Sequence, residues 1–251
     1  HVLKGKDVMK DKISIIIPTY NHLEDCLKPC IQSIINTTDL NKVEVIIVAN
    51  GCTDGTREYI EKLGNPFRLI WIDEQVGFIK ATNAGIRASI GEYIVLLNND
   101  TEVLKSDWLY YLKKPFDDLS VGITGPYKDW RFYWDDDVLI FREEYLVFYC
   151  AMIRRSLIDK IGLLDEDFGM GYEEDIDYCI RAKKAGYKLV QVPTNIKDEL
   201  QLNKEYLSTH PNQYWHEFPL IHKDKQTFTD SPPLQYLARK TSLLQKYPTK
   251  S

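Results

Sequence analysis

The sequence lacks the features that mark several large classes of protein. Its 251 residues contain no apolar run of transmembrane length, so the chain is not expected to span a membrane. The polar, lysine-rich first residues include no signal-peptide core, and the five cysteines form no CxxC pair. Both observations favour a reducing, cytoplasmic location. Cys26 and Cys30 lie one helical turn apart, which favours a buried helix face over a metal site.

The common phosphate-binding fingerprints are also absent, because the chain has neither a Walker A loop nor a GxGxxG motif. A phosphate could still be held by helix amino termini and a metal ion. The net charge of -5 is untypical of a general nucleic-acid binder, so no nucleic-acid partner is expected. With 44% hydrophobic and 27% charged residues, the composition is that of an ordinary globular protein.

Short apolar runs alternate with helical segments in the first half of the chain. The predicted strands are 13–17, 43–48, 68–72 and 92–97. The predicted helices are 23–35, 57–63 and 78–89. This alternation predicts right-handed crossovers, and strands that are nearly all apolar indicate helices on both faces of a sheet. We therefore predict an α/β fold with a Rossmann-like, mostly parallel central sheet.

Local signals set the expected ends of these elements. Pro18 should stop the first strand, and Pro29 should kink the helix 23–35. Asp54 or Thr53 is expected to cap the helix 57–63.

Polar side chains follow the fourth predicted strand, which ends in Asn98, Asn99 and Asp100. Oxygen-bearing side chains at the carboxyl end of a buried strand can form a ligand site, and such oxygens suit Mg²⁺ or Mn²⁺. The same residues are good turn formers, and Asp100 or Thr101 could cap a following helix. Taken alone, these residues favour the turn.

The second half continues the pattern with further elements. Strands are predicted at 121–125, 145–153 and 187–193, and helices at 108–116, 154–161 and 176–184. The stretch 129–137 mixes aromatic residues with aspartates, which suits a ligand-binding loop, because aromatic faces stack on apolar ligand surfaces and carboxylates accept hydrogen bonds from hydroxyls. The alternative is a hairpin with its aromatic residues in the core, and it is favoured for Phe132 and Trp134.

The expected organisation is a single domain between two end segments. Residues 1–12 are interpreted as a linker or tail, and 13–230 as one domain that contains two halves, at 13–101 and at 102–230. A helix or tail is predicted for 231–251.

Four motifs, each at a strand end or a helix start, resemble family 2 glycosyltransferases, which have the GT-A fold. They are IIIPTYN at 15–21, VANGCTDGT at 48–56, GFIKATNAG at 77–85 and LNND at 97–100. The last stands where the family has its Asp-x-Asp metal motif. Ala49 departs from the family's frequent Asp, and Asn98 replaces the first Asp of that motif, a form similar to rhamnosyltransferase-like members.

The resemblance implies a set of residues for a nucleotide-sugar. Pro18, Thr19, Tyr20 and Asn50 should line the base and ribose pocket, and Lys80 and Asn83 should approach the diphosphate or sugar. A solvated helix face is the alternative for Lys80. The other residues expected at the nucleotide-sugar are Asn21, Gly77, Asn98, Asn99 and Glu174.

The resemblance also implies roles in catalysis and metal binding. Asp175 corresponds to the family's catalytic base, although a carboxylate at a helix start can simply be a cap. Asp100 and His222 are expected to hold Mn²⁺ or Mg²⁺, with His216 as the competing histidine. A lone histidine is more often structural.

The implied activity is an inverting, metal-dependent transfer of a sugar from a UDP- or dTDP-sugar to a hydroxyl of a glycan or glycoconjugate. The alternatives are a non-catalytic carbohydrate-binding or scaffold domain with the same fold and a sugar nucleotidyltransferase. The chain could be one domain of a larger transferase, and peripheral contact with a membrane surface stays open.

Overall fold

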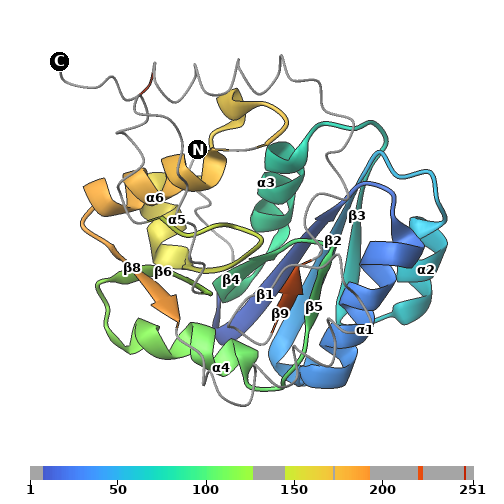
Figure 1. Ribbon diagram of the computed structural model, residues 1–251, viewed down its shortest axis with the longest axis horizontal. Coiled ribbons are helices and arrows are strands. Elements are labelled where there is room, and N and C mark those ends of the chain that lie inside the picture. Colours follow the sequence, from blue (N-terminus) through green and yellow to red (C-terminus); the bar gives the residue numbers. More distant parts are fainter. Residues whose placement is uncertain (1–7, 127–144, 172, 193–219, 223–245, 247–251) are drawn as a thin grey trace.

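Seven strands form a central sheet in the order β3-β2-β1-β4-β7-β6-β8 (Figure 1). This computed structural model describes residues 8–126, 145–171, 173–192, 220–222 and 246. The strands of the sheet are β1 (Met9–Thr19), β2 (Val43–Asn50), β3 (Phe67–Ile72), β4 (Gly91–Leu97), β6 (Val121–Pro126), β7 (Cys150–Arg154) and β8 (Lys188–Val192). The longer helices are α1 (Lys28–Thr37), α2 (Thr56–Leu63), α3 (Phe78–Ala88), α4 (Trp108–Lys113), α5 (Arg155–Ile161) and α6 (Glu174–Lys184).

The sheet is mostly parallel, as the sequence predicts. β1 pairs in parallel with β2 and β4, β2 with β3, and β6 with β8. β7 is antiparallel to both β4 and β6. The carboxyl ends of the parallel strands therefore meet at one edge, together with the amino end of β7. In open α/β sheets this edge is where ligands bind.

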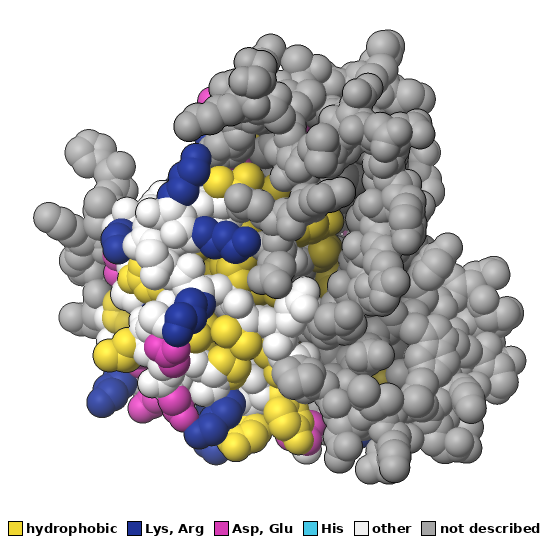
Figure 2. All heavy atoms as spheres, turned by 60° about the vertical axis from the view of Figure 1, so that its left-hand side comes forward, with side chains coloured by type: hydrophobic (Ala, Val, Ile, Leu, Met, Phe, Trp, Pro, Cys, Tyr) yellow, Lys and Arg dark blue, Asp and Glu magenta, His cyan; other side chains and the backbone are white. Residues whose placement is uncertain are grey.

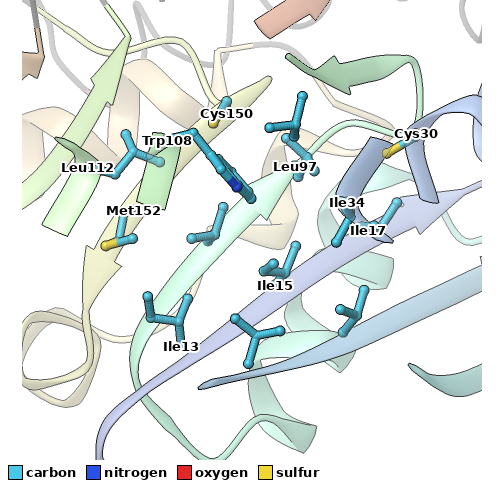
Figure 3. Close-up of a cluster of buried hydrophobic side chains, with 14 of the residues drawn as sticks. Ile13, Ile15, Ile17, Cys30, Ile34, Leu97, Trp108, Leu112, Cys150 and Met152 are labelled. Atoms are coloured by element: carbon cyan, nitrogen blue, oxygen red, sulfur yellow. The ribbon is translucent and has the colours of Figure 1, made fainter. Parts of the chain in front are cut away.

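Helices cover both faces of the sheet because successive side chains of each buried strand point to opposite sides. Ile13, Ile15 and Ile17 of β1 pack with α1, α2 and α4, whereas Ile16 packs with α3, α5 and α6. Figure 3 shows the first of these two clusters, in which Trp108 and Ile34 lie near the β1 isoleucines. All of these side chains are 6% exposed or less, so each strand has an apolar layer on both sides.

Two prolines have different effects from those expected. Pro18 does not stop β1, which continues to Thr19 and pairs Pro18 with Val48. β1 pairs with β4 only as far as Ile16, so at Pro18 the strand has a paired neighbour on the β2 side alone. Pro29 lies in the first turn of α1, where a missing N–H is tolerated, and a separate π-helical turn, η1 (Leu23–Leu27), precedes it.

Other predicted boundaries also shift. The strand expected at 145–153 forms only from Cys150 onward, and the helix expected at 108–116 ends at Lys113 and continues as the 3₁₀ turn η3 (Lys114–Asp117). β1 begins at Met9, inside the expected tail. The stretch 129–137, His216 and all of 231–251 except Lys246 lie outside the described residues.

A two-stranded ladder joins distant parts of the chain and was not predicted. β5 (Thr101–Val103) follows the Asn98–Asp100 turn, and β9 (Leu220–His222) pairs with it in antiparallel fashion. The register sets Thr101 opposite His222. The ladder therefore brings the backbone of His222 beside the residue that follows Asp100.

Charged side chains are mixed on the face shown in Figure 2. On its described part, Lys and Arg side chains are interspersed with Asp and Glu side chains and with apolar groups.

Lys246 is bound to the helix that carries the predicted base. The Asp177 side chain is fully buried in α6 and pairs with Arg181 at 2.7 Å and with the Lys246 ammonium at 2.8 Å. Lys246 also pairs with Asp165 and lies 5.3 Å from the Phe168 ring centroid. Two cations therefore compensate a carboxylate that has no access to water.

We expect Lys246→Met to lower the free energy of unfolding by about 1–2 kcal/mol, because a buried carboxylate loses one of its charged hydrogen-bond partners. Urea unfolding measures this change. Lys62→Met, which removes an exposed cation from α2, is the matched control and should leave the stability unchanged. Equal stability of the two variants would refute a structural role for Lys246.

Candidate functional site

The loops that follow β1 and β2 are bonded to each other at the ligand edge. The Asn21 amide oxygen accepts a hydrogen bond from the Thr53 N–H at 2.8 Å, and the Asn21 N–H donates to the Cys52 sulfur at 3.3 Å. Asp54 accepts from the Leu23 N–H at 2.8 Å. Asp54 therefore ties the two loops together and does not cap α2, whose N-cap position is Gly55.

The loop after β4 is bonded to β1 and to the segment that precedes β7. Asn99 is 4% exposed, and its amide nitrogen donates to the Thr19 hydroxyl at 2.9 Å. The Asn98 N–H donates to the carbonyl of Tyr149 at 2.8 Å. Pro18 is buried and Tyr20 is half-buried. The residues expected at the donor from β1 and β4 thus lie at one edge and are held by buried hydrogen bonds.

Asn50, at the end of β2, fixes the loop that leads into α3. It is 4% exposed, and its amide oxygen accepts a hydrogen bond from the Val76 N–H at 2.7 Å. Gly77 follows with φ +92°, and the Phe78 N–H then donates to the Met170 carbonyl at 2.9 Å. The amino end of α3 therefore lies against the segment that precedes α6.

We expect Gly77→Ala to lower both stability and donor affinity. A Cβ at Gly77 would lie 3.0 Å from the Cα of Met170, a backbone atom that cannot move without shifting its segment. Gly64→Ala is the matched control, since Gly64 also has positive φ (+65°) but a Cβ there would have no atom within 4 Å. Urea unfolding and nucleotide titration should show a larger loss for Gly77→Ala. Equal losses would mean that the Met170 contact has no effect.

The two α3 residues expected at the donor differ in their surroundings. The Lys80 side chain is exposed, whereas Asn83 is 1% exposed. The Asn83 amide nitrogen donates to the Leu164 carbonyl at 2.9 Å and to Glu166 at 3.0 Å, and its oxygen accepts from the Leu164 N–H at 3.1 Å. Asn83 thus joins α3 to the segment before α6, and its contact with a donor stays a prediction.

Asp100 is a buried carboxylate at the junction of β4 and β5. It is 4% exposed and precedes Thr101, the residue opposite His222 in the β5–β9 ladder. The backbones of the two residues expected to bind the metal are therefore brought near each other by the β5–β9 pairing.

Glu174 and Asp175 form the first turn of α6. Glu174 is 7% exposed, and the Asp175 carboxylate is half-buried and accepts a hydrogen bond from the Ile176 N–H at 2.8 Å. Glu173, the N-cap residue, has a left-handed backbone with φ +63°. Because α6 is followed after a short turn by β8, which runs parallel to β6, the amino end of α6 lies toward the ligand edge.

The segment 145–149 connects Asp175 with the loop that carries Asp100. At one end the Tyr149 carbonyl accepts from the Asn98 N–H, and near the other the Leu146 N–H donates to the Cys179 sulfur of α6 at 3.4 Å. Burial, followed by the nearby negative charge of Asp175, raises the pKa of Tyr145 to about 12. Tyr145 is therefore a neutral phenol at physiological pH. The segment 145–149 thus lies between the loop after β4, which it contacts through Asn98, and α6, which begins with Glu174 and Asp175.

Comparison with known proteins identifies the family. The sequence model described as Glycosyl transferase family 2 matches residues 14–162, more than half of the chain. The chain belongs to glycosyl transferase family 2. A rhamnosyltransferase subtype has no such support and stays a prediction. This family 2 chain is 31% identical over 157 residues to the glycosyltransferase GlyA of Streptococcus pneumoniae, a match that covers 61% of the chain and 20% of GlyA.

Solved glycosyltransferase structures share the fold of this family 2 chain. A mannosyltransferase from Pyrobaculum calidifontis, in complex with GDP-Man and Mn²⁺, superposes with a TM-score of 0.60 at 22% identity, covering 75% of this chain and 58% of that one. TarS of S. aureus in complex with UDP-GlcNAc gives 0.53 at 19% identity, covering 71% and 55%. The predicted GT-A fold is confirmed. The chain spans 20–30% of the length of GlyA and of two other curated relatives.

The structure brings most predicted site residues to one edge and adds others that sequence reasoning missed. Cys52 and Tyr145 contribute to this edge, and Met170 supports the start of α3. Cys52 lies within the motif at 48–56, but a thiol there carries no signal of its own, and Tyr145 and Met170 lie outside the four motifs.

In the described residues, no helix has both the length and the apolar character needed to cross a membrane.

Proposed function

We propose that this chain is the catalytic domain of an inverting, divalent-metal-dependent glycosyltransferase. Its donor would be a UDP- or dTDP-sugar, and its acceptor a hydroxyl of a glycan or glycoconjugate. One observation carries the proposal: the segment 145–149 is bonded to the loop after β4 and to α6, so it links the predicted metal and base residues. The family and the donor complexes of similar folds support it.

The donor pocket is proposed at the bonded loops after β1, β2 and β4. Thr19 and Asn99 share a buried hydrogen bond, and Asn50 fixes the loop 73–77, so these groups are held in place before a ligand binds. Groups that are already ordered lose little conformational entropy on binding. The amino end of α3 then offers backbone N–H groups, with Lys80 exposed nearby, to a diphosphate.

The residues near Asp100 fit a hard divalent cation. Asp100 is a buried carboxylate with the amide side chains of Asn98 and Asn99 beside it in the chain, and such oxygens are ligands that Mn²⁺ or Mg²⁺ accepts. The β5–β9 ladder sets the backbone of His222 opposite Thr101. We propose that Asp100 and His222 hold the ion. When bound, the ion supplies positive charge that stabilises the departing nucleoside diphosphate.

Asp175 is proposed to take the proton of the acceptor hydroxyl at its carboxylate. Its hydrogen bond from Ile176 holds the carboxylate in one orientation, and the half-buried position leaves it accessible to an acceptor. The hydroxyl oxygen then attacks the anomeric carbon opposite the leaving diphosphate, which inverts its configuration. The charge of Asp175 adds to burial in raising the pKa of Tyr145, so the phenol remains neutral and adds no like charge to the site.

The proposal predicts nucleotide binding that depends on metal. UDP or dTDP should raise the thermal midpoint with Mn²⁺ present and have much less effect without it, because the diphosphate binds partly through the ion. At a ligand concentration of 100 Kd the stabilisation is about 2.7 kcal/mol. A thermal-shift panel of UDP, dTDP and GDP with and without Mn²⁺ measures this. Glycan binding without any metal-dependent nucleotide effect would instead favour a non-catalytic carbohydrate-binding domain.

A further inference from the structure

A second group of potential metal ligands lies away from Asp100, at the start of the helical segment that follows β1. It consists of a ring nitrogen of His22, a carboxylate oxygen of Asp25 and the Cys26 sulfur, which all lie within 4.8 Å of one another. Nδ1 and Oδ2 are 3.0 Å apart. Among the described residues, no other group of three or more His, Cys, Asp or Glu side chains has this spacing.

The backbone holds these three side chains on one turn. His22 has a left-handed backbone, with φ +58°, and its carbonyl accepts hydrogen bonds from the N–H groups of Cys26 (3.1 Å) and Leu27 (3.0 Å). On either side, the Asn21 and Leu23 backbones are bonded to the loop after β2. The backbone hydrogen bonds therefore fix where the three side chains start, and the His22–Asp25 hydrogen bond aligns two of the ligand atoms.

We propose that His22, Asp25 and Cys26 bind one divalent cation of the Zn²⁺ class, with water completing its coordination. The 3.0 Å separation of Nδ1 and Oδ2 suits two ligands on one Zn²⁺, whose bonds to nitrogen and oxygen are about 2.0–2.2 Å. Cys26 is 1% exposed, so its sulfur reaches the site from the buried side. The side chains of His22 and Asp25 are 37% and 53% exposed, so the site has an open side for water.

The ligand chemistry separates this site from the proposed Asp100 site. A sulfur, a nitrogen and an oxygen suit borderline ions such as Zn²⁺ or Co²⁺, whereas Mg²⁺ and Mn²⁺ prefer oxygen. On binding, the Cys26 S–H bond breaks, its proton passes to water, and a sulfur–metal bond forms. The cation also replaces the hydrogen bond that now joins His22 to Asp25. This inference does not depend on the proposed function.

Cobalt substitution in the whole chain tests the proposal, because a thiolate bound to Co²⁺ gives a near-ultraviolet charge-transfer band. We expect this band in the wild-type protein and its loss on addition of Zn²⁺. Cys26→Ser should abolish the band, and His22→Gln should weaken Co²⁺ binding at least tenfold. The control is Cys30→Ser, which changes a buried cysteine of α1 one helical turn away and should keep the band.

Three results would overturn the proposal: no band in the wild type, a band that persists in Cys26→Ser, or an unchanged Co²⁺ affinity in His22→Gln. Circular dichroism checks the fold of each variant. Should Cys26→Ser fail to fold, the half-exposed position of His22 keeps the second variant informative. Titrating Mn²⁺ and UDP into His22→Gln separates this site from the donor site, since we expect donor binding to be unchanged.

Discussion

Replacing Asp175 with asparagine is expected to reduce sugar transfer by roughly 10²- to 10⁴-fold, the range typical of losing a positioned general base. The amide keeps the shape of the side chain but cannot accept the acceptor's proton. Nucleotide affinity should be unchanged, because the donor loops after β1, β2 and β4 are bonded to one another without Asp175. Initial rates with saturating donor and a separate nucleotide titration distinguish the two effects.

Asp167→Asn is the matched control for this substitution. Asp167 lies in the short turn η5 (Glu166–Phe168) before α6 and is exposed, so its amide variant should keep wild-type rates. A wild-type rate in Asp175→Asn would refute the assignment of the base. A loss of nucleotide binding equal to the loss of rate would instead give Asp175 a role in the donor pocket.

Asp100→Asn is expected to weaken Mn²⁺-dependent UDP binding by roughly 10²-fold or more, since even residues that only support a metal ligand cost 10- to 100-fold in metal affinity. The substitution removes the carboxylate from a position that is 4% exposed, while the amide fills the same volume. Transfer should fall with it. Titrating UDP at fixed Mn²⁺, and again with a chelator, isolates the metal-dependent part of the affinity.

The control for Asp100→Asn is Glu102→Gln, which removes a partly exposed carboxylate two residues further along the chain. It should retain metal-dependent binding. If Asp100→Asn binds UDP and Mn²⁺ as tightly as the wild type, another group holds the ion, and the proposed centre is wrong.

The strands and the ligand edge could be predicted from sequence because their signals are local. Ile15, Ile16 and Ile17 are buried on both sides of the sheet, which is what an unbroken apolar run of strand length indicates. The same reasoning located the turn after Leu97 and the start of α6, since polar residues follow apolar ones there. The apolar run 145–153 was less informative, because Leu146 and Phe148 are buried beside α6 and not within a strand.

Pairings between distant residues could not be predicted in this way. The β5–β9 ladder consists of two three-residue strands far apart in the chain, and neither has an apolar run long enough to predict a strand. Asn83 illustrates the same limit for a single side chain. Its motif suggests a ligand contact, yet its amide is bonded to Leu164 and Glu166, partners that only the folded chain brings near.

The location of Mn²⁺ in a crystal of this chain grown with UDP tests the central claim most directly, through the anomalous signal of the ion. We expect a single Mn²⁺ peak within coordination distance of both the Asp100 carboxylate and the UDP diphosphate, with the Asp175 carboxylate lining the same hollow. A nucleotide-bound Mn²⁺ away from Asp100, or an Asp175 carboxylate that opens onto another surface, would contradict the account.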